Sequence, residues 1–255
     1  MEHSEEILIQ KRFFDLSGLA ERKCMLTFSN FLNQNELSLF HEAVPRLDTA
    51  YRLFGGYEFA ERQMIAFIPE ALSYYTVTDS DFPIVCLRFR PAHPKFAEKL
   101  SHRDILGSLM GLGIERSRIG DIKSDGQEHY IFCEESISGY ILQSLTQIRR
   151  TAVSGEHIEA GNIAFKQKFE QIEGIISSCR LDNIIAFLLK LSREKSAALI
   201  RSQKVFVNDK TAFANAYQCK EGDVISIRGY GKFIYVGNSG ETRKGRIKVS
   251  LKKYC

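Results

Sequence analysis

The side chains whose type and spacing most clearly indicate a chemical role are basic, and they lie between positions 180 and 232 of the 255-residue chain. Lysine and arginine neutralise phosphate groups, and the N–H groups of a helix N-terminus attract phosphate as well. Arg193 follows a serine suited to begin a helix, so it is our first candidate. Arg180 could instead pair with Asp182 or Asp223 and stabilise the fold. The candidate nucleic-acid contacts are Arg180, Ser192, Arg193, Lys195, Arg201, Lys204, Asn208, Lys210, Arg228 and Lys232.

Charge is distributed unevenly along the chain. The net charge is +4, from 35 Lys and Arg against 31 Asp and Glu. Residues 175–255 hold 16 of the basic residues and 6 of the acidic ones, a net of +10, and the preceding 174 residues carry −6. This asymmetry favours a C-terminal part that binds nucleic acid, attached to a nearly neutral remainder.

Two short helices and a small sheet are expected to position these basic residues. Apolar residues recur at helical spacing up to Leu189, and Ser192 then offers an N-cap for a second helix. Small alanines allow this second helix to pack closely on the first. The expected elements are helices over 184–189 and 193–202 and strands over 205–207 and 224–228, with a polar turn at Asn208-Asp209.

This segment resembles the S4 RNA-binding domain. The matching residues are Arg180-Leu181-Asp182, Ser192-Arg193, Ala197, Ile200, Val205, Val207-Asn208, Gly222-Asp223 and Arg228-Gly229. The resemblance implies two packed helices on a small sheet, with basic residues facing structured RNA. Gln203 and Asp209 stand where the family usually has glycine. Asp tolerates turns, but a Cβ is penalised in the left-handed conformation, so Gln203 is either strained or ends its helix differently.

Residues 82–160 carry alternating strand and helix signals. The predicted order is strand 82–90, helix 102–112 capped by Ser101, strand 119–124, strand 128–134, helix 136–148 and strand 151–158, with a hairpin turn at Asp125-Gly126. This βαββαβ order is typical of ferredoxin-like and RRM-like domains. An RRM stacks bases on aromatic residues of its central strands, which makes Tyr130 and Phe132 candidates. The usual RNP consensus is absent, and the alternative is that both residues are core.

The first 80 residues carry mainly helical signals. The expected elements are a helix over Glu6–Leu19 that ends at Gly18, a helix over Phe28–Phe40 capped by Thr27 or Ser29, and a strand over Met64–Ile68. Three arginines of this part, Arg46, Arg52 and Arg62, are either phosphate contacts or solvated surface residues.

Two further stretches, GGYEFAERQMIAFIP at 55–69 and HRDILGSLMGLGIERSRIGDI at 102–122, extend the resemblance. Together with the S4 segment they resemble the YlmH family of bacterial S4-domain RNA-binding proteins. That resemblance implies binding to rRNA of the large ribosomal subunit, a site near tRNA or peptidyl-tRNA, and a role in rescue or quality control of stalled subunits. The residues by themselves indicate structured RNA.

The predicted fold is α+β and multidomain. It comprises a mixed, mainly helical N-terminal part (1–80), a ferredoxin-like or RRM-like domain (81–162), a connector (163–174) with a strand signal at 163–169, and an S4 domain of the αL type (175–255). After residue 233 we expect a strand over 233–236, a turn at 238–240 and a basic C-terminal strand, for which a flexible basic tail is the alternative.

Catalytic chemistry is not indicated. His102-Arg103-Asp104 lacks the remaining kinase motifs, the histidines lack metal-ligand spacing, and the six cysteines form no CxxC pair. The sequence contains no run of eighteen apolar residues, so we expect no membrane span. We expect a non-catalytic, monomeric, cytoplasmic protein without cofactor or metal. The alternatives are an RNA-modifying enzyme related to pseudouridine synthases, using the region 46–51 or the central domain, and an adaptor that the S4 domain tethers to RNA.

Overall fold

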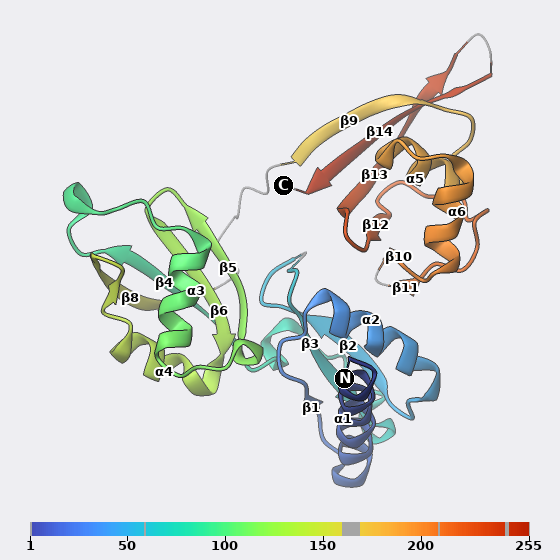
Figure 1. Ribbon diagram of the computed structural model, residues 1–255. Helices are drawn as coiled ribbons and strands as arrows, with labels where there is room; N and C mark the ends of the chain where they lie inside the picture. Colours follow the sequence, from blue (N-terminus) through green and yellow to red (C-terminus); the bar gives the residue numbers. More distant parts are fainter. Residues whose placement is uncertain (1, 59, 160–168, 209, 243–244, 255) are drawn as a thin grey trace. The chain divides into compact units, whose positions relative to one another are not determined.

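The computed structural model describes residues 2–58, 60–159, 169–208, 210–242 and 245–254. The chain divides into two compact units, Met1–Ala164 and Phe165–Cys255. Both mix helices with antiparallel sheets, as predicted for an α+β protein (Figure 1).

The first part of unit one is a small sheet packed on two helices. Its strands are β1 (Thr27–Phe28), β2 (Ala50–Phe54) and β3 (Met64–Ile68), in the order β1-β3-β2, and its helices are α1 (Glu2–Lys23) and α2 (Gln34–Ala43). Phe40 lies at the centre of the core, with its ring edge-on to Phe13, Tyr51 and Phe67. The strand predicted at 64–68 is confirmed.

Both helix predictions in this part are wrong at their ends. Helix α1 continues through Gly18 to Lys23, because Phe13 and Ala20, on either side of the glycine, are both buried in the core. That packing outweighs the cost of a glycine in a helix, about 1 kcal/mol. Helix α2 does not start at Thr27 or Ser29; a capping box of Asn33 and Glu36 begins it instead.

The second part of unit one has the predicted βαββαβ order. Its elements are β4 (Ile84–Pro91), α3 (His102–Gly111), β5 (Ile119–Asp125), β6 (Glu128–Glu134), α4 (Glu135–Ser144), β7 (Gln147–Ile148) and β8 (Thr151–Ile158). The sheet order is β5-β6-β4-β8-β7, and α3 and α4 cover one face of it (Figure 1). Ser101 caps α3 as predicted. Helix α4 ends earlier than predicted, because residues 147–148 pair with β8 and bury Ile148.

Unit two is a six-stranded sheet with two helices on one face. Its elements are β9 (Phe169–Ile176), α5 (Leu181–Leu189), α6 (Arg193–Arg201), β10 (Val205–Val207), β11 (Lys210–Thr211), β12 (Val224–Ile227), β13 (Gly231–Glu241) and β14 (Ile247–Tyr254). The order is β11-β10-β12-β13-β14-β9. Apolar residues of the helices, such as Ile184, Ile185 and Ile200, share one core with Phe233 and Leu251 of the strands.

The two helices, the strands at 205–207 and 224–227 and the basic C-terminal strand follow the sequence prediction. Two other predictions are wrong. Residues 169–174, expected in a connector, lie in β9, whose whole length pairs with β14. The turn expected at 238–240 is part of β13, which continues to Glu241. Residues 163–168 of the predicted strand at 163–169, and Asp209 of the predicted turn, lie outside the described residues.

Gln203 stands where the S4 family usually has glycine, and the structure shows how helix α6 ends there. Its φ is +55°, so it adopts the left-handed conformation despite its side chain. Gln203 N donates to the Ile200 carbonyl, and Lys204 N donates to the Leu199 carbonyl. These are the two hydrogen bonds of a Schellman motif, so the helix ends as it would with glycine and Gln203 carries the strain.

Candidate nucleic-acid interface

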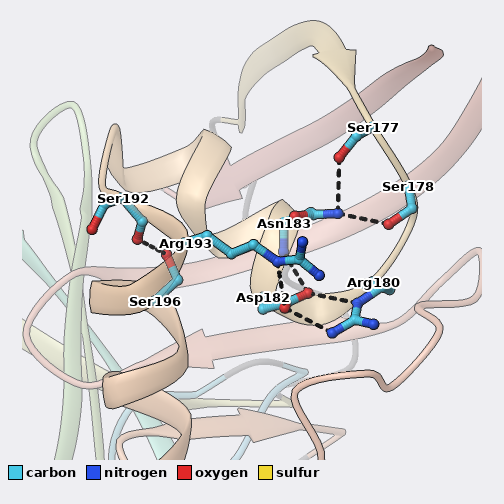
Figure 2. A network of polar contacts seen from close by, with 8 residues as sticks. All are labelled: Ser177, Ser178, Arg180, Asp182, Asn183, Ser192, Arg193 and Ser196. Atoms are coloured by element: carbon cyan, nitrogen blue, oxygen red, sulfur yellow. Dashed lines mark hydrogen bonds and ion pairs between the residues drawn. The ribbon is translucent and has the colours of Figure 1, made fainter.

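A buried acidic residue, Asp182, organises two of the predicted basic contacts. Its carboxylate accepts hydrogen bonds from Arg180 Nε (3.0 Å), Arg180 Nη2 (2.9 Å) and Arg193 Nε (3.1 Å), as Figure 2 shows. We call these three residues the Asp182 fork. The Asp182 side chain is 4% exposed, whereas Arg180 is 32% and Arg193 61% exposed. One buried anion therefore fixes two guanidinium groups at the surface.

The N-termini of α5 and α6 bring the fork together. Arg180 is the N-cap of α5, Asp182 lies in the first turn of that helix, and Arg193 is the first residue of α6. Ser192 caps α6, because its Oγ accepts a hydrogen bond from Lys195 N at 3.3 Å. Ser196 Oγ donates to the Ser192 carbonyl at 3.1 Å (Figure 2). The N–H groups at both helix starts add positive potential beside the fork.

The protonation states of the fork follow from these contacts. Burial alone would raise the pKa of Asp182, but the hydrogen bonds from Arg180 and Arg193 outweigh it, and the pKa is lowered. The hydrogen bond to Asp182 raises the pKa of Arg180. Asp182 is therefore ionised at neutral pH, and arginine side chains stay protonated in proteins, so the fork carries one net positive charge, suited to an anion such as phosphate.

Most of the other predicted contacts extend this surface along α6. Arg193, Lys195 and Arg201 are exposed on the helix, and Lys204 follows it. Arg228 N donates to the Lys204 carbonyl at 2.8 Å, which places exposed Arg228 beside Lys204. The sequence reasoning missed Lys190, which is exposed in the left-handed cap of α5. The sequence feature that could have indicated Lys190 is its position two residues before Ser192, the N-cap of α6.

Three of the predicted contacts are placed differently. The Asn208 amide is engaged in the fold, since its Nδ2 donates to Asp223 (2.8 Å) and its Oδ1 accepts from Val224 N (2.9 Å). Lys232 alternates with buried Phe233, so it lies on the sheet face away from α5 and α6. Lys210 begins β11, and its side chain lies outside the described residues.

The RRM-like sheet does not present the aromatic platform considered for Tyr130 and Phe132. Phe132 is fully buried, with its ring centroid 4.9 Å from that of Tyr57. Gly56 approaches so closely that a Cβ there would lie 2.3 Å from Phe132 Cδ1. Tyr130 is 7% exposed, and its hydroxyl donates to Glu128 at 2.6 Å. Both residues are core, so the alternative interpretation is confirmed.

Arg62 connects the two parts of unit one instead of facing solvent. Its backbone N–H, that of Glu61 and the Tyr57 hydroxyl all donate to the Asp121 carboxylate of β5. The Arg62 side chain is half-buried, which lowers its pKa, and it donates to the carbonyls of Phe31, Arg116 and Ile119. These contacts give Tyr57, Glu61 and Arg62 of the GGYEFAERQMIAFIP stretch a structural role.

Arg46, Arg52 and the region 46–51, which was considered as an enzyme site, also make structural contacts. Arg52 forms an ion pair with Asp79, and the Arg46 guanidinium lies 5.0 Å from the centroid of the Phe14 ring. Thr49 is buried, with its hydroxyl 3.0 Å from that of Ser17. Within the region 46–51, Thr49 is thus part of the local packing, whereas Arg46, Asp48 and Ala50 are exposed.

Residues 78–162 match the family model "Putative RNA-binding domain in YlmH", and residues 179–225 match the S4 domain. A relative, "Ribosome-associated protein quality control protein P2" of Bacillus subtilis (strain 168), is 30% identical over 236 residues, which are 92% of this chain and 90% of the relative. The chain belongs to the YlmH family.

A solved YlmH structure supports the fold. "Cell division protein ylmH from Streptococcus pneumoniae" aligns with a TM-score of 0.51 and 23% sequence identity, covering 60% of this chain and 91% of that one. In this YlmH-family chain the Asp182 fork and α6 lie inside the S4 match, and the buried Phe132 lies inside the other match. Within the described residues, no helix is long and apolar enough to cross a membrane.

Proposed function

We propose that this YlmH-family protein binds structured rRNA of the large ribosomal subunit, near tRNA or peptidyl-tRNA, through α5 and α6. It acts there without catalysis, as a cytoplasmic monomer, in translation or in quality control of stalled complexes. The Asp182 fork is the observation that carries this proposal, because it presents two fixed guanidinium groups at two helix N-termini.

Three findings support the proposal. The S4 match covers the fork and α6, where the exposed basic residues gather. The net charge of residues 175–255 is +10, which suits a polyanion. The relative's name describes a ribosome-associated quality-control protein, and the alignment spans 92% of this chain.

A salt titration of binding to purified large subunits tests the proposal. Each phosphate contact that is lost should reduce the slope of log affinity against log salt by about one. We expect this reduction for Arg193→Gln and Lys195→Gln. Arg22→Gln, which removes an exposed arginine from α1 in the other unit, serves as the matched control and should keep the wild-type slope.

Three outcomes contradict the proposal. Equal slopes for Arg193→Gln, Lys195→Gln and Arg22→Gln would remove α6 from the interface. A variant that binds subunits normally while rRNA loses a modification would favour the enzyme alternative. Retained subunit binding with loss of a protein partner after changes in residues 1–80 would favour the adaptor.

A further inference from the structure

The sheet of unit two has a second face, which α5 and α6 do not cover. Phe233, Tyr235, Val249 and Leu251 point into the core beneath the helices. Since side chains alternate along a strand, their neighbours point the other way. We call this opposite side the open face, formed by Phe169, Gln171, Glu173, Ile175, Phe206, Val224, Ser226, Lys232, Ile234, Lys248, Ser250, Lys252 and Tyr254.

Strand register gathers the lysines of the open face over the middle strands. Lys252 lies opposite Ile234 of β13 and Gln171 of β9, and Lys232 lies opposite Ser226 of β12. Lys248 is exposed further along β14. The residues of the open face include three lysines and one carboxylate, that of Glu173. This carboxylate accepts a hydrogen bond from Gln171 Nε2 at 2.9 Å. The open face is therefore positively charged.

An aromatic pair lies at one end of the open face. Phe169 and Tyr254 are opposite each other on β9 and β14, with ring centroids 5.1 Å apart and planes at 64°. Lys252 Nζ lies 5.6 Å from the centroid of the Phe169 ring. Phe169 is 38% exposed, although it lies in a strand and contacts Lys252. An exposed ring beside an ammonium group can stack on a base while the lysine contacts the adjoining phosphate.

We propose that the open face binds a single-stranded segment of RNA, separately from the α5–α6 surface. Lys232, Lys248 and Lys252 contact phosphates along the bound strand, and the exposed Phe169 ring, supported by Tyr254, stacks a base. This combination of a basic track and aromatic platforms is what sequence-tolerant binding of single strands requires. Strands β9, β13 and β14 lie outside the residues 179–225 matched as the S4 domain. The inference rests on the proposed function, because it adds a second RNA contact to the same unit.

The test uses the full-length protein and a 12-nucleotide oligouridylate. Lys252→Gln and Lys253→Gln form a matched pair, since these adjacent lysines of β14 are both half-buried and point to opposite faces of the sheet. Lys252→Gln should reduce the salt slope by about 0.7, the value for one phosphate of a single strand, and Lys253→Gln should leave it unchanged. Phe169→Leu keeps the site apolar and should weaken binding at least about 5-fold, but should not affect an abasic 12-mer.

The outcomes separate this inference from the proposed function. The inference would be overturned if the two lysine variants gave equal salt slopes. It would also be overturned if Phe169→Leu weakened binding of the abasic 12-mer as much as binding of the oligouridylate. Wild-type protein that binds large subunits but not the 12-mer would also overturn it, and would leave the α5–α6 proposal standing. Protein that binds neither would refute both. A dimer in sedimentation that Lys252→Gln disrupts would assign the open face to a second copy of the chain instead.

Discussion

Replacing Asp182 with asparagine separates the two effects of the fork, because it removes the buried charge but keeps the shape of the side chain. The carboxylate accepts three hydrogen bonds from two arginines. Hydrogen bonds to charged groups contribute about 1.5–3 kcal/mol. Arg193 is 61% exposed and regains water when released, so the lower part of that range applies. We expect unit two to lose about 2 kcal/mol of unfolding free energy at pH 7.

The pH dependence of this loss has a definite sign. The folded-state pKa of Asp182 is lowered, so its stabilisation is complete above the unfolded-state value of about 3.9 and disappears as the pH falls below that value towards the folded pKa. The difference in urea-unfolding free energy between wild type and Asp182→Asn should therefore be constant near neutral pH and shrink below about pH 4. A difference that persists unchanged at pH 2 would refute the ionic explanation.

RNA binding by the same variant tests whether the fork matters through its geometry or its charge. Asp182→Asn raises the net charge by one, so a purely electrostatic surface would bind RNA more tightly. If the fork holds its arginines in a binding geometry, affinity should instead fall about 3- to 10-fold. Asp223→Asn is the matched control, because Asp223 is also buried but is bonded to Asn208, Tyr217 and Lys220 N. Tighter binding by Asp182→Asn would refute preorganisation.

Further substitutions and truncations have expected results. Gln203→Gly should stabilise unit two by about 0.5–1 kcal/mol in urea unfolding, because it relieves a left-handed residue at some cost in chain entropy, whereas Gly222→Ala, at φ +88°, should destabilise it. A fragment of residues 165–255 should be folded when measured by circular dichroism. A fragment of residues 175–255 should be less stable, because it lacks most of β9 and the contacts of Ile172 with the core. Equal stability of the two fragments would contradict the pairing of β9 in the sheet. Tyr57→Phe should lower the thermal midpoint of unit one, because it removes the 2.6 Å hydrogen bond to buried Asp121, and an unchanged midpoint would show that this contact is dispensable.

Elements with strong local signals were predictable from the sequence. Strands β6 and β8 have the predicted bounds because hydrophobic alternation and turn residues frame them, and α3 starts where Ser101 caps it. The two-residue strand β1 was missed because its partner, β3, lies 38 to 40 positions away in the sequence. Strand β2 was also missed, although β3 follows it after only nine residues. Helix α1 runs through Gly18 because of tertiary packing, which local propensity cannot report.

The candidate site was predictable in part. The basic residues of α6 follow from composition and spacing, and the pairing of Arg180 with Asp182 was one of two stated alternatives. The contact of Arg193 with the same carboxylate spans 11 positions and depends on how α5 packs against α6, so the sequence did not reveal it. The engagement of Asn208 with Asp223 and Val224 likewise required the folded strands.

The pairing of β9 with β14 has a consequence for biosynthesis. The partners in this ladder are separated by 71 to 85 positions, from Ile176 with Ile247 to Phe169 with Tyr254. Closing so long a loop is entropically costly and tends to be slow. Val249 and Leu251 of β14 also form part of the core on which α5 and α6 rest. A ribosome making this protein therefore completes the sequences of α5 and α6 well before residues 247–254 exist to pack against them.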